Sequence, residues 1–447
     1  MKLIATTIAQ FLMLVTIGKQ VLGLSSRRIS LATRNPLATA AALQMVSSTA
    51  TTTTTATAEN PLLVYDGLPK FGSIEPSNLT PAVEELLEQV QRDFNLLEED
   101  LTKRNEEGTI DYDGVLPRVE KMQYPIGFVW GVAGHLNGVK NGDELREAYE
   151  SNQPKVVQSM TQFSQSKPLY DALTAIEKQW KEDGEGKDDD VDDGACPSSF
   201  LMQQKRRAVE NSLLEMKLGG VGLAGEEKER FNEIKQKLAK LSTTFSNNVL
   251  DDTKAFSFTV ENIEKMDGVP QSAKALWASS HAEYMKTKNT EASNESEDDT
   301  IMDLDKAAKN GPWRITLDIP SYLPVMSHIR DRNLRETIYK AYIKRASEVN
   351  QEKNNIPLIY EILSLKQEMA RLLGFDNYAE LSLAKKMAPS VNAVTELTDL
   401  MAKKAIPAAR KELEEITALA RKQGGEEYSV DKLEKLAPWD TTFWVRK

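Results

Sequence analysis

Hydrophobic residues recur every three or four positions over long stretches of this sequence, the spacing of one face of an α-helix. After Thr80-Pro81, a helix-start signal, the repeat runs Val83, Leu86, Val90, Phe94, Leu97, Leu101. A second run is Phe231, Ile234, Leu238, Leu241, Phe245, and its helix is expected to end near Val249-Leu250. These patterns predict long helices packed through one apolar face.

Two more helices are predicted in the last hundred residues. One runs from about Pro357 to Leu373 and ends at Gly374, the residue best suited to a left-handed helix end; residues 375–378 then start the next helix. The other covers 391–422 and contains Pro407, which lacks a backbone N–H. We expect a kink or break just before Pro407 and a stop at Gly424-Gly425.

Strand signals are few and short. Apolar residues alternate in Phe256, Phe258 and Val260, and again in Trp313, Ile315, Leu317 and Ile319 before Pro320. The two segments are predicted to pair as a small sheet between helices. The expected fold class is therefore mainly α, with one or two short β-strand pairs.

Polar segments interrupt the helical pattern twice. Residues 181–194 contain eight acidic residues and three glycines, and residues 285–310 are dominated by Lys, Asn, Ser, Glu and Asp. Both compositions are typical of solvated loops. A chain of 447 residues also exceeds the size at which one core usually keeps growing, so two or three lobes are expected.

The first 58 residues have the composition of a targeting sequence. An apolar segment follows Lys2, then small residues, and then a Ser-, Thr- and Arg-containing stretch with no acid before Glu59. A Thr/Ala tract at 47–57 reads as a tether or as part of this presequence. A signal followed by a transit-like stretch is similar to two-part plastid presequences; secretion and mitochondrial import are the alternatives.

The charge and the cysteine content narrow the partners and sites that this protein can have. The formal charge is −11, and because residues 1–58 hold five Lys and Arg and no acid, the remainder carries −16. That sign disfavours nucleic-acid partners. The sequence suggests no stable membrane span, and the single Cys196 excludes an intramolecular disulfide and a cysteine-rich zinc site.

One long run carries a family resemblance. It reads Trp-Arg-Ile-Thr-Leu-Asp-Ile-Pro-Ser-Tyr-Leu-Pro at 313–324 and Leu-Leu-Gly-Phe-Asp-Asn-Tyr-Ala-Glu-Leu at 372–381, with further matches at 131–141 and 222–258. This sequence resembles the thimet oligopeptidase family of zinc metallopeptidases, and within it the oligopeptidase A group. The resemblance implies a helical fold whose lobes flank a channel for short, unfolded peptides.

The zinc motif that this resemblance implies is missing from the sequence. The family's His-Glu-x-x-His places two imidazoles on one helix face and a glutamate beside a metal-bound water. The only histidines are His135, His281 and His328, none close to another and none followed by Glu. We predict no catalytic residue and no zinc ligand in this chain, and no hydrolysis by it alone. Zinc is implied only for the full-length family enzyme.

The end of the sequence gives a further expectation. Residues 437–444 resemble the family segment that opens another helix, and the sequence stops three residues later, before the family's zinc helix. We therefore expect a targeting presequence and linker at 1–58, an N-terminal helical region at 60–180, an acidic loop at 181–196, and the scaffold of the peptidase domain at 197–447, cut before the zinc helix.

Other candidate chemistry is sparse. No nucleophile elbow or phosphate-binding loop is present. Four arginines, Arg330, Arg332, Arg335 and Arg345, suit a peptide carboxylate, but pairing with acids across helices is the favoured interpretation. Expected partners are short peptides, including cleaved presequences, and the missing catalytic region. The alternative function is a noncatalytic helical module that binds peptides or a partner chain.

Overall fold

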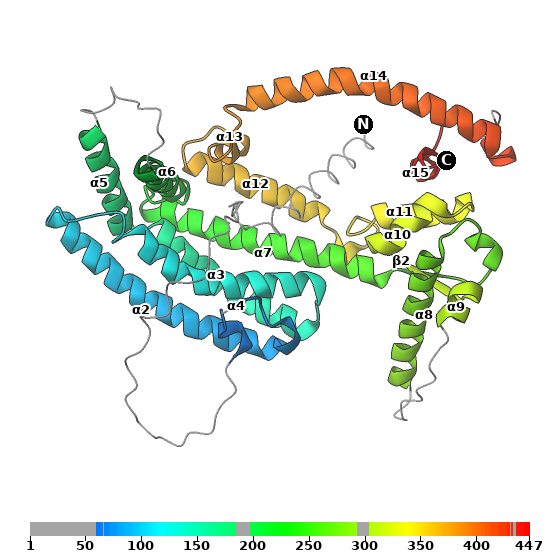
Figure 1. Cartoon of the computed structure of the whole chain (residues 1–447), viewed down its shortest axis with the longest axis horizontal. Coiled ribbons are helices and arrows are strands. Elements are labelled where there is room, and N and C mark those ends of the chain that lie inside the picture. Colours follow the sequence, from blue (N-terminus) through cyan, green and yellow to red (C-terminus); the bar gives the residue numbers. More distant parts are fainter. Residues whose placement is uncertain (1–59, 66, 185–196, 293–303, 430, 432–434) are drawn as a thin grey trace. The chain divides into compact units, whose positions relative to one another are not determined.

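The computed structural model describes residues 60–447 except 66, 185–196, 293–303, 430 and 432–434 (Figure 1). The predicted presequence at 1–58 lies outside this part of the chain. Two compact units divide the chain, Met1–Val156 and Val157–Lys447, with the boundary inside helix α4 (Asp143–Ser164). The ranges 60–180 and 197–447 proposed from the sequence remain predictions.

The first unit packs two long helices against each other. They are α2 (Leu79–Glu106) and α3 (Leu116–Val139), preceded by the short turns η1 (Pro61–Leu63), η2 (Phe71–Ser73) and η3 (Pro76–Asn78). The six apolar positions predicted to face the core of α2 are all buried. The predicted cap at Thr80 is wrong by two residues, because the cap is Asn78 and the helix begins at Leu79, with Pro81 inside its first turn.

The second unit contains the rest of the described helices. Their bounds are α5 (Lys167–Gly184), α6 (Pro197–Leu218), α7 (Gly225–Ala255), α8 (Gln271–Ala292), α9 (Leu304–Asn310), α10 (Ile319–His328), α11 (Arg332–Ile343), α12 (Ile356–Leu372), α13 (Tyr378–Leu383), α14 (Val391–Gln423), α15 (Pro438–Val445). Short 3-10 turns are η4 (Ile263–Met266), η5 (Gln351–Lys353), η6 (Glu426–Tyr428).

Several sequence-based boundaries need correction. Helix α7 continues to Ala255, past the predicted end at Val249-Leu250. The 285–310 segment is not one loop, since α8 reaches Ala292 and α9 begins at Leu304. Likewise α5 extends to Gly184, into the predicted acidic loop, and the remainder of that loop lies outside the described residues.

The predicted small sheet is confirmed. Strands β1 (Ser257–Val260) and β2 (Trp313–Thr316) pair antiparallel, with Val260 opposite Trp313 and Phe258 opposite Ile315. The second strand is shorter than the alternation suggested, because Ile319 opens α10 with Pro320 in its first turn, where a missing N–H costs nothing.

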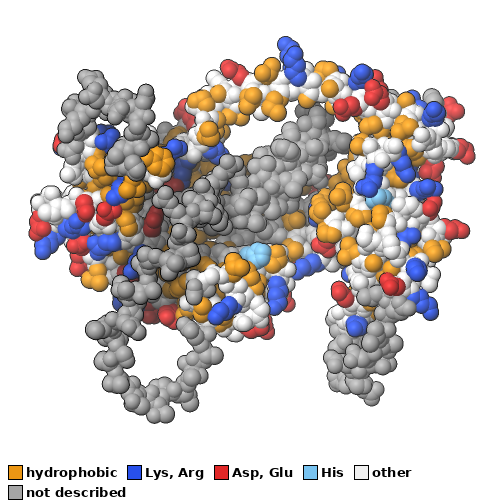
Figure 2. Space-filling model, viewed as in Figure 1, with side chains coloured by type: hydrophobic (Ala, Val, Ile, Leu, Met, Phe, Trp, Pro, Cys, Tyr) orange, Lys and Arg blue, Asp and Glu red, His pale blue; other side chains and the backbone are white. Residues whose placement is uncertain are grey.

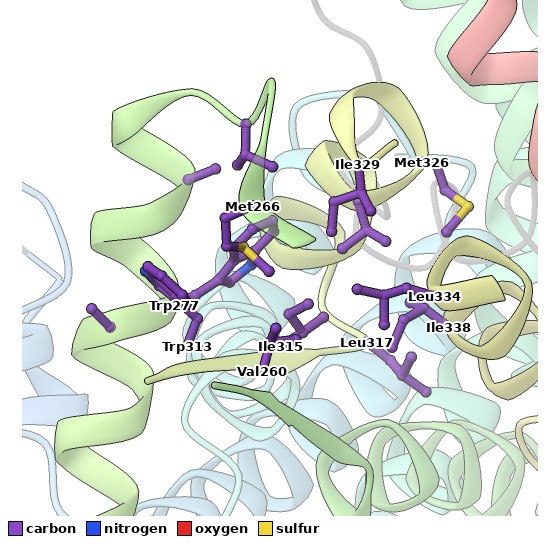
Figure 3. Close-up of a cluster of buried hydrophobic side chains, with 14 of the residues drawn as sticks. Val260, Met266, Trp277, Trp313, Ile315, Leu317, Met326, Ile329, Leu334 and Ile338 are labelled. Carbon is purple, nitrogen blue, oxygen red and sulfur yellow. The ribbon is translucent and has the colours of Figure 1, made fainter. Parts of the chain in front are cut away.

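A single apolar core joins the sheet to α8, α9, α10 and α11. Trp277, Trp313 and Ile315 are fully buried, and the cluster continues past Leu317 to Met326, Leu334 and Ile338 (Figure 3). The indole of Trp277 donates to Ser321 Oγ at 2.9 Å, and that oxygen also accepts from the Thr316 N–H at 2.9 Å. A buried polar group is thereby satisfied where α8, β2 and α10 meet.

Helix α12 lies along α7, and the loop before α12 is held by α7 side chains. Arg230 forms a two-pronged pair with Glu368 at 2.6 and 2.9 Å. Asp252 accepts the N–H of Ala346, which has the unusual φ of 48°. Buried Asn355 donates to the Phe245 carbonyl, and these contacts fix where α12 begins.

Helix α14 is the clearest departure from the expected local structure. It is continuous over 33 residues with Pro407 inside it, and Figure 1 shows one curved helix. Of the predicted kink or break before Pro407, the break is wrong, because losing one backbone bond bends a long helix without ending it. The predicted stop is confirmed, since Gly424 caps the helix. Across the described residues, no helix has the length and apolar character needed to cross a membrane.

Candidate functional site

The three histidines stand on different elements. His135 lies in α3 with its ring centroid 5.4 Å from that of Phe71, His281 lies in α8, and His328 is the last residue of α10. Within the described ranges, no group of three or more His, Cys, Asp or Glu side chains is placed to hold a metal ion.

The surroundings of His328 do not suit a bound cation. Burial lowers the pKa of His328, and the positive charges of Arg446 and Lys447 lower it further. A neutral imidazole is available as a ligand, but the same two charges oppose a divalent metal beside it. The described side chains therefore do not fit the zinc site that the resemblance implies.

Two of the four arginines lie outside the buried cluster described below, Arg330 exposed and Arg345 half-buried. Arg330 pairs with Asp267 at 2.6 Å. Arg345 donates to Thr253 Oγ1 at 2.8 Å, and its guanidinium lies 3.7 Å from the ring centroid of Tyr342. The favoured interpretation, pairing with acids, is confirmed for Arg330, whereas Arg345 is held by a hydroxyl and an aromatic ring.

Arg335 is fully buried and all of its donors are used. Its N–H groups donate at 2.6–3.0 Å to the carbonyl oxygens of Ile329, Arg330 and Trp439, to the Tyr428 hydroxyl, and to Asp440 Oδ1. A guanidinium has five N–H donors, so none is left for a substrate carboxylate. The predicted pairing is confirmed, and Arg335 is a structural residue.

Asp440 is the acid that both remaining arginines share. Arg332 binds it through Nε and Nη2 at 2.9–3.1 Å, and Tyr428 donates to its Oδ1 at 2.9 Å. Burial alone would raise the pKa of Asp440, but the hydrogen bonds from Arg332, Arg335 and Tyr428 outweigh it and hold that pKa below its usual value. The carboxylate is thus kept ionised inside the protein.

This buried cluster joins three elements of the second unit. It links α11 to η6 through Tyr428 and to α15 through Asp440. Phe443 lies under the Arg335 guanidinium at 4.4 Å, and Trp444 meets Tyr428 edge to face. Together with Ile416 and Leu419 of α14, these aromatic residues form a small core that anchors the last turns of α14.

Most of α14 lies outside that anchor. Residues 394–415 are all exposed, although the helix is amphipathic. Leu397 is 58% exposed and Met401 61%. Figure 2 shows hydrophobic side chains along this helix at the surface. Helix α12 has a second exposed apolar face, made by Ile356, Ile359, Tyr360 and Leu363.

Sequence reasoning found the helices but neither the buried cluster nor the exposed faces. Arg335 and Asp440 are 105 residues apart, and no local spacing connects them. A signal for the exposed faces existed in the apolar repeat of α14, but periodicity shows only that a face is apolar, not whether it is covered.

Two family patterns match this helical chain. Residues 83–228 match the N-terminal domain of neurolysin/thimet oligopeptidase, and residues 325–447 match peptidase family M3. The chain belongs to the thimet oligopeptidase family, peptidase family M3.

Among curated proteins, the similarity is to oligopeptidases A. The organellar oligopeptidase A, chloroplastic/mitochondrial, of Arabidopsis thaliana is 35% identical over 87% of this chain and 43% of its own length. Oligopeptidase A of Haemophilus influenzae is 34% identical over 87% of this chain and 50% of its own. That of Escherichia coli is 33% identical over the same shares. The chain thus spans about half the length of the curated relatives it matches.

Proposed function

We propose that this chain is the substrate-enclosing scaffold of an oligopeptidase A-type zinc metallopeptidase that hydrolyses short peptides, including cleaved presequences. One observation carries the proposal. The similarity to oligopeptidases A extends over 87% of the chain, yet its three histidines are scattered singly along the sequence. The scaffold is therefore present without a metal-binding pair.

In this proposal the chemistry comes from protein outside these 447 residues. Zinc, when held there, activates water for attack on an internal peptide bond. This chain contributes helices that shape and limit the space around the peptide. It hydrolyses nothing by itself, because no described cluster of its side chains suits the metal.

A noncatalytic helical module is the rival function. Such a module would cover its own apolar surface with polar side chains. The exposed apolar faces of α12 and α14 favour the scaffold instead, since contiguous exposed apolar surface usually marks a binding interface.

The proposed compartment is a plastid. The composition of residues 1–58 supports import into an organelle, and one relative is named as chloroplastic/mitochondrial. Another relative, at 34% identity, is named a probable cytosolic oligopeptidase A, so the presequence rather than the family carries this proposal. Fusion of residues 1–58 to a fluorescent protein tests it, and cytosolic fluorescence would refute it.

The function is tested by comparing this chain with a chimera. In the chimera, the chain replaces the matched half of Haemophilus influenzae oligopeptidase A and is followed by the rest of that relative. We expect no cleavage of an internally quenched peptide by the chain alone. The chimera should cleave it, lose activity with 1,10-phenanthroline and regain it with zinc.

Two results would contradict the proposal. Chelator-sensitive cleavage with stoichiometric zinc in the chain alone would show that it holds its own active site. A chimera that is folded by circular dichroism and monodisperse but does not cleave the peptide would reject the scaffold and favour the noncatalytic module. A chimera joined from two halves of the native relative controls for the fusion point.

A further inference from the structure

An asparagine is followed by glycine three times in this sequence, at 137–138, 141–142 and 310–311. In such a pair the glycine backbone nitrogen can attack the side-chain amide carbon of the asparagine, which closes a five-membered succinimide ring and releases ammonia. Glycine permits this attack best, because it has no side chain to restrict the backbone. Whether a pair reacts in a folded protein therefore depends on what holds its glycine nitrogen.

Two of the three glycine nitrogens are held in helical hydrogen bonds. Gly138 lies inside α3, where helical geometry directs its N–H to the carbonyl of residue 134. The Gly311 N–H donates to the Ala307 carbonyl at 2.8 Å, in the last turn of α9. A nitrogen bound in this way neither loses its proton readily nor turns toward the preceding side chain. These two pairs are therefore protected.

The third glycine, Gly142, lies between α3 and α4 and is exposed. Its carbonyl accepts the Arg146 N–H at 2.9 Å at the start of α4, but within the described part of the chain its own N–H has no acceptor. A Cβ placed on Gly142 would meet nothing within 4 Å. Its nitrogen is therefore open to water, which can remove the proton.

The side chain of Asn141 is held with its carbonyl group polarised. Arg146 Nη2 donates to Asn141 Oδ1 at 2.5 Å. The Asn141 amide nitrogen donates to the Asn137 carbonyl at 2.9 Å and to Asn137 Oδ1 at 2.8 Å. Attack at Cγ places negative charge on Oδ1, and a guanidinium already bound to that oxygen stabilises the charge as an oxyanion hole does.

We propose that Asn141 deamidates spontaneously in the folded protein and that Arg146 assists the reaction. The Gly142 nitrogen gives its proton to solvent and forms a bond to Cγ of Asn141. The bond from Cγ to Nδ2 breaks, and Nδ2 takes a proton from solvent and leaves as ammonia. Water then opens the ring at either carbonyl and gives aspartate or isoaspartate, so the whole reaction consumes one water molecule.

The product changes the junction between two helices. A carboxylate has no N–H, so the Asn137 carbonyl near the end of α3 loses its side-chain donor. The same carboxylate remains an acceptor for Arg146, now in a charge-assisted bond. Deamidation therefore weakens the end of α3 and preserves the contact with α4.

The test incubates the purified full chain at mildly alkaline pH and measures conversion of each asparagine by mass spectrometry of its peptides. In the wild type, Asn141 should react at least tenfold faster than the asparagines at 137 and 310. Arg146→Gln should slow it at least threefold. The control, Arg92→Gln, makes the same change at an exposed arginine of α2 and should leave the rate unaltered. In urea the three sites should react within threefold of one another.

Four results would each overturn the proposal. They are no conversion at Asn141, equal conversion at another Asn-Gly pair of the folded chain, aspartate as the sole product, or an unchanged rate in folded Arg146→Gln. Aspartate alone would indicate direct hydrolysis, because ring opening gives both products. Circular dichroism shows whether Arg146→Gln folds. If it does not, the wild type decides, since assistance by Arg146 requires Asn141 to react at least as fast in the folded chain as in urea.

Discussion

At the scale of single residues, Asp440 is the acid around which the buried cluster is built. Its carboxylate compensates two arginines, one of them fully buried, and accepts from the Tyr428 hydroxyl. Burial raises the pKa of Tyr428, so that phenol stays protonated and remains a donor. Removing the negative charge leaves Arg335 charged in a site closed to water.

We predict that Asp440→Asn lowers the free energy of unfolding of the second unit by about 3–5 kcal/mol, the cost of leaving a buried charge without its partner. Asp267→Asn, which breaks the exposed pair with Arg330, should cost less than about 1 kcal/mol. Urea unfolding followed by tryptophan fluorescence measures both. Similar losses in the two variants would show that the buried cluster contributes no more to the free energy of unfolding than the exposed pair does.

The same residue predicts a pH dependence. Because the pKa of Asp440 is lower in the folded protein, its stabilisation is fully present above the unfolded value of about 3.9 and is lost as pH falls through the folded value. The stability difference between wild type and Asp440→Asn should stay constant from pH 7 to 5 and shrink only below pH 4. A difference that already shrinks between pH 7 and 5 would show a raised pKa instead.

At the scale of elements, α14 is held at one end and exposed along the rest. Its last turns pack on η6 and α15, whereas residues 394–415 have no buried side chain. An exposed helix depends on its own backbone bonds, so this stretch belongs to the less stable part of the unit. Pro407 weakens it further, because the Lys403 carbonyl receives no bond from an N–H four residues later.

We predict that Pro407→Ala slows amide hydrogen exchange around residues 403–411 by at least tenfold, since it restores a helical bond and removes a steric clash. Pro357→Ala is the matched control. Pro357 lies in the first turn of α12, where no intrahelical donor is lost, and its replacement should change exchange in α12 by less than threefold. Unchanged or faster exchange in α14 would show that tertiary contacts, not the backbone, limit its stability.

At the scale of the whole molecule, sequence pattern and family resemblance accounted for the fold class. The apolar repeat of α2 placed its buried face correctly, and alternation placed both strands. The errors have physical causes. Proline in a long helix bends it without ending it, and alternation past Leu317 could not reveal that Ile319 starts a helix.

The candidate site was less predictable than the fold. Arg332 and Arg335 were singled out as arginines that pair with acids, but Asp440 was not recognised as their partner, because burial depends on how distant elements pack. The exposed apolar side chains of α14, such as Leu397 and Met401, resemble buried ones in sequence, so only the structure distinguishes covered from uncovered positions. The spacing of apolar residues along the sequence therefore predicted where each helix lies, but it did not predict what each helix packs against.

The distance along the chain between Arg335 and Asp440 has a consequence during synthesis. Ribosomes add about 5–20 residues per second, so Asp440 follows Arg335, 105 residues earlier, by roughly 5–20 s. Throughout that interval the residues of α11 have been synthesised, whereas the carboxylate that neutralises the Arg335 guanidinium has not. Arg335 must stay hydrated until α15 has been synthesised, because a nascent chain that buries this arginine earlier encloses a charge without its partner.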